Sequence, residues 1–147
     1  PTANVVYFIQ HTGTPLAIEV EILNVQHLAF AYFDIEYDSG KIHYISTVPG
    51  NIESATPSVI AMLNPGDTQG RLRVVIDFSN YGGDGVSGSG CLCGITFEAV
   101  NTGTFQLDFV SGQGEPEGEL TLLQWIDFHQ YTVSGVSWIN GSVTVAP

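Results

Sequence analysis

The chain has 147 residues, which suits one domain that buries roughly two-thirds of its unfolded surface and needs no disulfide or metal to hold a core. Three cations against 15 acidic residues give a net charge of −12, which excludes nucleic acid as a partner because phosphate binding needs a basic surface. Hydrophobic residues make up 44% of the chain, too many for a disordered chain, and the apolar runs are too short for membrane insertion.

Alternation of apolar and polar residues predicts β-strands from the N-terminus onward. The first is expected over Asn4–Gln10 and ends at the turn-forming segment Thr12–Pro15. The second is expected over Leu16–Val25, where apolar residues alternate with Glu19 and Glu21. One face of this strand should therefore lie on the core and the other should face outward.

The segment Leu28–Asp38 (LAFAYFDIEYD) predicts a third strand with an unusual outer face. Its odd positions are apolar throughout and should face the core. Its even positions are first aromatic, at Phe30 and Tyr32, and then acidic, at Asp34 and Glu36. An exposed patch of this kind suits a protein partner better than water. The alternative is that the two aromatics lie beneath a loop or beneath side chains of a neighbouring strand.

Short strand-like segments, separated by turn-forming residues, continue to the C-terminus. They cover Lys41–Val48, Val59–Leu63, Arg71–Asn80, Cys91–Val100, Thr104–Val110, Leu120–Phe128, Tyr131–Val133, Val136–Ile139 and Ser142–Val145. In the segment Arg71–Asn80, alternation places Arg71, Arg73, Val75 and Asp77 outward. We expect about nine strands and no helix in all, which predicts an all-β sandwich or barrel.

Four connections stand out between these segments. Pro49–Gly50 is expected to end the strand before it, and Asn140–Gly141 is a strong hairpin signal before the last strand. Tyr81–Gly90 is expected to be a glycine-rich loop and Ser111–Glu119 an acidic one.

The two cysteines, Cys91 and Cys93, are two residues apart in a predicted strand. Alternate strand residues have Cα atoms roughly 6.5–7 Å apart, at the outer limit for a disulfide. We expect both cysteines to be reduced and to face the core beside Ile95 and Phe97. The C-x-C spacing lacks the second ligand pair that a zinc site needs.

No catalytic motif emerges from the sequence. A G-x-G-x-x-G string at Gly83, Gly85 and Gly88 precedes a predicted strand, whereas a dinucleotide site needs a helix there, so we expect a flexible loop. The histidines are scattered, and no nucleophile elbow or catalytic triad can be proposed from spacing. We expect no cofactor. Calcium stays open as a metal, because oxygen-rich loops such as Glu115–Glu119 could bind it.

Four segments resemble cellulosomal cohesin domains and occur in that family's order. They are LNVQHLAFAYFDIEYD at Leu23–Asp38, STVPG at Ser46–Gly50, GDGVSGSGCLCGITFEAVNTGTFQLDF at Gly83–Phe109 and WINGSVTV at Trp138–Val145. The resemblance implies a single nine-stranded jelly-roll sandwich over residues 1–147, with no enzymatic activity. It also implies that one sheet face binds a dockerin, a small module with two calcium loops, which places calcium on the partner.

The resemblance implies an exported protein, either a scaffold for polysaccharide-degrading enzymes or a cell-surface protein. No charged-then-apolar leader begins the sequence, so we expect any export signal to have been removed or to have been left out of this sequence. A homodimer through the same face is an alternative that the sequence leaves open. The residues predicted to bind the partner are Phe30, Tyr32, Asp34, Glu36, Arg73, Val75 and Asp77.

Two other functions fit the same predicted fold. A carbohydrate-binding module would stack sugar rings on surface aromatics such as Trp125, Tyr131 or Trp138. A structural spacer of a surface protein would have no ligand of its own. A planar row of aromatics would favour the glycan, whereas aromatics beside Arg73 and Asp77 would favour a protein partner.

Overall fold

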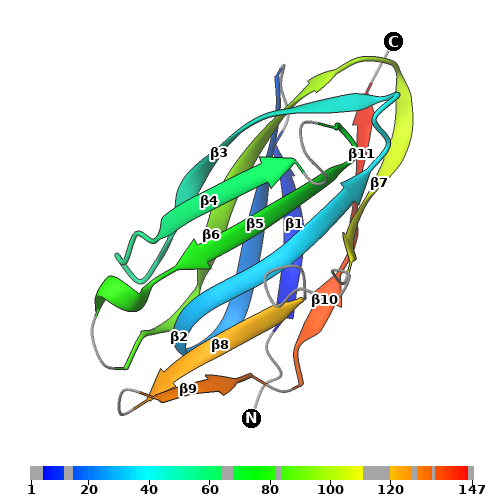
Figure 1. The fold of residues 1–147 in the computed structure, drawn as a ribbon. Helices are drawn as coiled ribbons and strands as arrows, with labels where there is room; N and C mark the ends of the chain where they lie inside the picture. Colours follow the sequence, from blue (N-terminus) through cyan, green and yellow to red (C-terminus); the bar gives the residue numbers. More distant parts are fainter. Residues whose placement is uncertain are drawn as a thin grey trace.

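The fold is organised around one long strand, β2 (Leu16–Tyr37), which passes from one sheet of a β-sandwich to the other (Figure 1). The structure is a computed structural model, and it describes residues 5–11, 15–63, 68–81, 84–110, 120–126, 129–133 and 135–145. Within these residues it contains eleven strands and one 3-10 turn, Ser79–Tyr81. The other strands are β1 (Val5–His11), β3 (Ile42–Ile52), β4 (Ser58–Leu63), β5 (Arg71–Asp77), β6 (Val86–Ala99), β7 (Gly103–Val110), β8 (Thr121–Ile126), β9 (His129–Thr132), β10 (Ser137–Ile139) and β11 (Gly141–Val145).

The two halves of β2 belong to different sheets. The first half pairs with β1 on one side and β6 on the other, and β10 and β3 extend this sheet beyond them. The second half pairs with β5 on one side and with β8 and β7 on the other. Strand β4 extends this second sheet beyond β5, while β9 pairs with β8 and β11 with β7. The predicted all-β sandwich is confirmed, with eleven strands in the described residues instead of nine.

The sequence predicted two strands where the structure has one bent strand. The bend lies at Asn24 and His27, whose φ angles are 57° and 55°, and the pairing with β6 slips on either side of Val25. The backbone N–H groups of Asn24 and His27 donate to the hydroxyls of Ser89 (3.0 Å) and Ser87 (3.1 Å) of β6. Side chains of β6 therefore satisfy donors that the bulges remove from the strand ladder.

The prediction that Pro49–Gly50 ends a strand is wrong, because β3 continues to Ile52. Among the described strands β3 pairs only with β6, so it is an edge strand, where a proline without an N–H is tolerated. A Cβ atom on Gly50 would clash with the backbone carbonyl oxygen of Cys91. Glycine therefore allows the two backbones to approach closely at this position.

The prediction for the cysteines is half right. Both are free thiols, and Cys93 is buried, but Cys91 is only partly buried. Cys93 pairs with Val20 and Cys91 with Glu21, so Leu92 is an extra residue in β6. This bulge breaks the alternation on which the prediction rested, and Cys91 lies on the outer face.

Two predicted connections also differ. Asn140–Gly141 is not a hairpin turn, because β10 pairs with β1 and β11 with β7, so the chain passes here from one sheet to the other. The Asn140 side-chain oxygen accepts a 2.9 Å hydrogen bond from the Phe109 N–H, which anchors this crossing. The predicted loop Tyr81–Gly90 is shorter than expected, because β6 begins at Val86.

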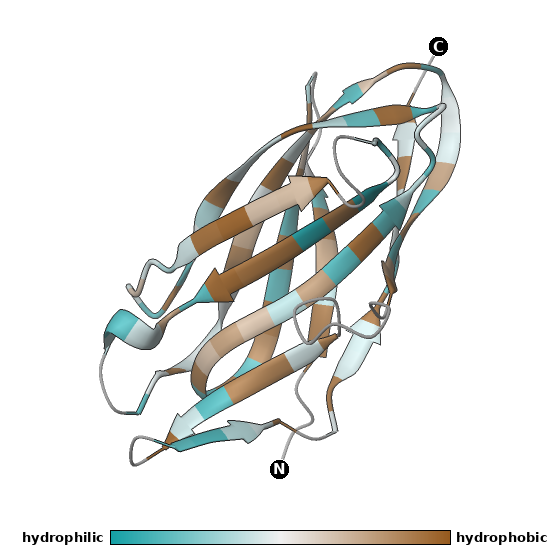
Figure 2. Cartoon of the chain, in the orientation of Figure 1, coloured by the Kyte–Doolittle hydropathy of each residue, from teal (hydrophilic) through white to brown (hydrophobic). Residues whose placement is uncertain are grey.

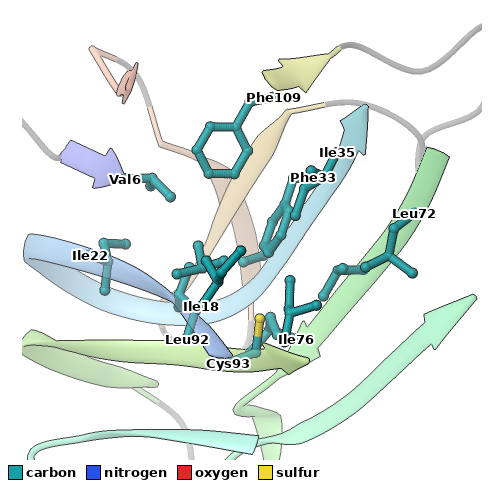
Figure 3. Packing of buried hydrophobic residues seen from close by; sticks show 14 of the residues in the cluster. Val6, Ile18, Ile22, Phe33, Ile35, Leu72, Ile76, Leu92, Cys93 and Phe109 are labelled. Atoms are coloured by element: carbon teal, nitrogen blue, oxygen red, sulfur yellow. The ribbon is translucent and has the colours of Figure 1, made fainter. Parts of the chain in front are cut away.

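The core lies between the two sheets and takes apolar side chains from both (Figure 3). Along the strands, hydrophobic residues alternate with hydrophilic ones, as the hydropathy colours in Figure 2 show. Phe109 stacks on Phe8 at a centroid distance of 4.3 Å and meets the rings of Phe33 and Trp138 edge-on at 5.6 and 5.2 Å. The described residues contain no helix of the length and hydrophobicity needed to cross a membrane.

Candidate partner-binding face

The outer surface of β4, β5 and the second half of β2 carries side chains in rows that run across the strands. We call this surface the three-strand face. From β4 through β5 to β2, the rows are Ser58–Asp77–Phe30, Ile60–Val75–Tyr32 and Met62–Arg73–Asp34, followed by the pair Arg71–Glu36. All seven residues predicted to bind a partner therefore lie on one surface of the sheet.

The apolar part of the three-strand face includes two residues that the sequence reasoning missed. Ile60 and Met62 on β4 are 59% and 51% exposed, and they continue the rows of Tyr32 and Arg73. Phe30 and Tyr32 are half-buried and stack on each other, with centroids 6.0 Å apart and ring planes 11° apart. Alternation within the predicted strand Val59–Leu63 was the available signal.

Asp34 is not part of an exposed patch, and the prediction from the sequence is wrong on this point. Its side chain is fully buried, whereas the sequence pattern placed it at the surface. Arg71 donates from Nε to Asp34 Oδ2 at 2.9 Å, and Arg73 donates from Nε to Asp34 Oδ1 at 3.1 Å. A third contact joins Arg73 Nη2 to Oδ2 at 3.5 Å. Two guanidinium groups from β5 therefore cover one carboxylate, which balances the cost of removing its charge from water.

The other acidic residues of the three-strand face stand in different surroundings. Asp77 accepts a hydrogen bond from the Ser79 N–H at 2.7 Å and so stabilises the turn after β5. Glu36 is exposed at the end of β2, directly opposite Asp108 of β7. Glu36 and Asp108 line an open hollow of about 450 Å³, to which Asp38 also contributes. The hollow at the Glu36 end of the face is therefore acidic, whereas the row of Ile60, Val75 and Tyr32 is apolar.

The aromatics that a glycan site would need do not form one platform. Trp138 packs its ring against Phe109 and Phe33 of the core, with centroids 5.2 and 6.1 Å apart. Tyr131 on β9 lies opposite Gln124 of β8, so Trp125, the next residue of β8, faces the other side of this hairpin. The three residues therefore do not offer the planar row that would favour a sugar ligand.

A second acidic cluster lies on the outer face of the other sheet. Glu19, Glu21 and Cys91 place one potential ligand atom each within 4.8 Å of one another. Burial, followed by the charges of Glu21 and Glu19, raises the pKa of Cys91 to about 12. The thiol therefore stays protonated at neutral pH, which makes it a poor nucleophile.

Two sequence motifs fall partly or wholly outside the described residues. The candidate calcium loop Glu115–Glu119 lies outside them, as does Gly83 of the glycine-rich string. Gly85 and Gly88 have positive φ angles of 63° and 125° and lead into or lie in β6. The segment is followed by a strand, as predicted, so it lacks the helix that a phosphate site of this kind requires.

Comparison with known proteins identifies a family. The sequence pattern of the family described as Cohesin domain matches residues 9–117 of this chain. A comparison with curated protein sequences found no match.

Several solved structures have the same fold as this chain. The second type II cohesin module of the ScaA scaffoldin from Acetivibrio cellulolyticus has a TM-score of 0.75 at 16% identity, covering 99% of this chain and 98% of that one. A non-cellulosomal cohesin from the archaeon Archaeoglobus fulgidus has a TM-score of 0.72 at 17% identity, covering 99% and 93%. The sixth cohesin of scaffoldin B from A. cellulolyticus, solved with a Cel5 dockerin mutant, has a TM-score of 0.71 at 16% identity, covering 99% and 100%.

Proposed function

Because this chain belongs to the cohesin family, a family of non-catalytic binding modules, we propose that it binds a dockerin-type protein module through the three-strand face. The proposal includes a location outside the cell, in a scaffold or surface protein that collects proteins carrying dockerins. Cellulosomal and non-cellulosomal cohesins are both similar in fold, so the proposal covers assemblies with and without polysaccharide-degrading enzymes.

The observation that carries this proposal is the set of side chains in the rows of the three-strand face. Ile60 and Met62 are large apolar residues that are more than half exposed. Ile60 continues across Val75 to Tyr32, which stacks on Phe30, and Met62 occupies the next outward position of β4. Contiguous apolar side chains with aromatics and an arginine beside them are typical of the centre of a protein interface.

The geometry of the sheet also supports a protein partner over a small ligand. The rows lie across three hydrogen-bonded strands, so their side chains are held by a rigid backbone. Arg73 and Asp34 are fixed by hydrogen bonds at one side of the apolar part. Such a surface can dock a partner with little loss of conformational freedom.

The experiment is an Ile60→Asp substitution measured by isothermal titration calorimetry. The probes are the calcium-loaded dockerin modules encoded in the genome that encodes this chain. We expect binding to at least one of them, weakened by about 2 kcal/mol or more in the variant, because a charge would be buried at the interface centre.

The matched control is Val48→Asp on β3, since Val48 is 58% exposed but lies in the other sheet. We expect Val48→Asp to bind like the wild type and both variants to keep their melting temperature within a few degrees. Equal loss of affinity in the two variants, or no binding by the wild-type chain to any dockerin, would contradict the proposal.

Calcium provides a second arm of this experiment. If the ion belongs to the partner, EDTA abolishes binding while the melting temperature of the isolated chain changes little. A fall of many degrees in the isolated chain would instead show that this chain holds structural calcium.

A further inference from the structure

The three-strand face contains both arginines of the chain, and both bind one carboxylate. The sequence has three cations, and the third, Lys41, lies immediately before β3 with its Nζ 3.5 Å from the carbonyl oxygen of Thr102. Arg71 and Arg73 approach the buried Asp34 from neighbouring positions of β5. A chain with a charge of −12 thus places two of its three positive charges at one point of the surface predicted to bind.

Arg73 is held in place before any partner arrives. It donates from Nε to Oδ1 and from Nη2 to Oδ2 of Asp34, so both carboxylate oxygens orient the guanidinium plane. Its side chain is 18% exposed, so part of the group still reaches the surface. A guanidinium has five N–H donors, and the two contacts to Asp34 leave donors for another acceptor.

The surroundings of the two arginines differ. Arg73 lies between Met62 on β4 and Asp34 on β2, in the row next to that of Ile60 and Val75. Arg71 lies one row further on, opposite the exposed Glu36. A partner that covers the apolar rows would therefore exclude water around Arg73 first, and a hydrogen bond is stronger in a dry environment.

We propose that Arg73, positioned by Asp34, is an anchor that donates hydrogen bonds to a carbonyl oxygen of the docked partner, and this inference rests on the proposed function. Asp34 acts as a positioning residue and makes no contact with the partner. Arg71 donates to Oδ2 of Asp34 and so helps to hold this carboxylate in place.

The local charge favours a neutral carbonyl over a carboxylate as the acceptor. Arg71 and Arg73 with Asp34 sum to +1, but Glu36 and Asp77 flank them on the same face and bring the sum to −1. A partner carboxylate would therefore meet no net attraction from the face as a whole. A carbonyl oxygen has no charge to be repelled, and it still accepts from the fixed guanidinium.

The test compares Arg73→Lys with Arg71→Lys. Each substitution keeps the positive charge and removes the planar fork, and each affects one hydrogen-bonded partner of Asp34. Binding to the calcium-loaded dockerins is titrated by calorimetry at about 0.1 M and about 1 M salt, between which the Debye length falls from about 10 to about 3 Å. Circular dichroism and melting temperature show that each variant is folded at the temperature of titration.

We expect Arg73→Lys to weaken binding about tenfold or more, equivalent to about 1.4 kcal/mol, and Arg71→Lys by less than about threefold. Arg73→Gln, which removes the charge as well as the fork, should weaken binding by the same factor at both salt concentrations, because the acceptor is uncharged. Asp34→Asn keeps the shape of the side chain but weakens its hold on the Arg73 guanidinium, so it should mainly raise the dissociation rate of the partner. If Arg73→Lys does not fold, Asp34→Asn takes its place in the test.

Several results would overturn the anchor. Equal effects of the two lysine substitutions would show that the cluster only stabilises the sheet. An Arg73→Gln effect that shrinks at high salt would make the acceptor a carboxylate. Wild-type affinity in Arg73→Lys, with Ile60→Asp still defective, would remove the anchor and leave the proposed function intact. Failure of the wild-type chain to bind any dockerin would remove both.

Discussion

The two halves of β2 follow the same sequence pattern but have opposite electrostatic surroundings. Each half alternates apolar residues with outward residues that include two acids, Glu19 and Glu21 in the first and Asp34 and Glu36 in the second. The first half lies between β1 and β6, neither of which contains a lysine or arginine. The second half lies beside β5, which contains both arginines of the chain.

The carboxylates of the two halves therefore have different effects. In the second half the charge of Asp34 is balanced by arginines, whereas in the first half burial, together with Glu21 and Glu19, raises the pKa of the Cys91 thiol. Asp34 is fully buried between two guanidinium groups. Glu21 and Glu19, together with burial, raise the pKa of Cys91 to about 12. The neighbouring strands, and not β2 itself, therefore decide whether an acidic side chain on the outer face is paired with a cation.

The largest expected effect is on folding stability at Asp34. Asp34→Ala should lower the free energy of unfolding by about 3 kcal/mol, because it removes the buried partner of two arginines. The matched variant Glu19→Ala, at an outward position of the other half, should change stability by less than about 1 kcal/mol. Urea denaturation of both variants at neutral pH measures the difference. Equal losses of stability in Asp34→Ala and Glu19→Ala would contradict the difference in electrostatic surroundings between the two halves of β2.

A second comparison concerns binding by the aromatics of the two halves. Tyr32→Ala should weaken dockerin binding by about 2 kcal/mol, because aromatics near the centre of an interface are frequent hot spots. Tyr7→Ala is the control, since Tyr7 of β1 is also half-buried but lies opposite Glu21 on the outer face of the other sheet. Calorimetric titration should show wild-type affinity for Tyr7→Ala. If Tyr32→Ala instead unfolds the chain, Tyr32 is a core residue and the three-strand face is wrongly assigned.

Alkaline pH should destabilise the chain, because the folded state raises the pKa values of Cys91, beside Glu19 and Glu21, and of the buried Cys93 and Tyr37. Burial raises the pKa of Cys91 from 9.0 to about 12, and it also raises the pKa values of Cys93 and Tyr37. Above pH 9 the unfolded chain releases thiol protons that the folded chain retains, so the unfolded state binds fewer protons. The free energy of unfolding should therefore be undiminished below pH 9 and fall as pH rises toward 12.

The measurement is urea denaturation in a reducing buffer across this pH range. Cys91→Ala should show a shallower fall than the wild type, because it removes one of the groups. Identical slopes for the two proteins would mean that Cys91 titrates normally in the folded state.

The smallest expected effect is at Glu21. Glu21→Gln should stabilise the chain by about 0.5 kcal/mol, because it removes repulsion between neighbouring carboxylates. The same substitution should speed the reaction of Cys91 with a thiol reagent at pH 8, since one of the charges that raise its pKa is gone. A slower reaction, or a loss of stability, would show that Glu21 does not act on Cys91 through its charge.

Much of the local structure could be predicted from the sequence because strand alternation is a local property. Leu72, Val74 and Ile76 of β5 are buried as the pattern indicates, and so are Phe105, Leu107 and Phe109 of β7. The prediction was wrong at Cys91, where the bulge at Leu92 shifts the alternation by one residue. A bulge depends on which strand lies alongside, and the pattern of a single strand does not contain that information.

The sequence by itself determined the all-β class, the alternation that puts the seven predicted residues on one side of their strands, and the excess of negative charge. These follow from composition and from the two-residue period of an extended chain. Only the tertiary structure decided that β2 serves both sheets, that Ile60 and Met62 extend the apolar rows, and that Asp34 is buried. Each of these depends on pairing between segments far apart in the chain, since Asp34 and Arg73 are 39 positions apart. Contacts at such separations arise only when the strands are placed side by side.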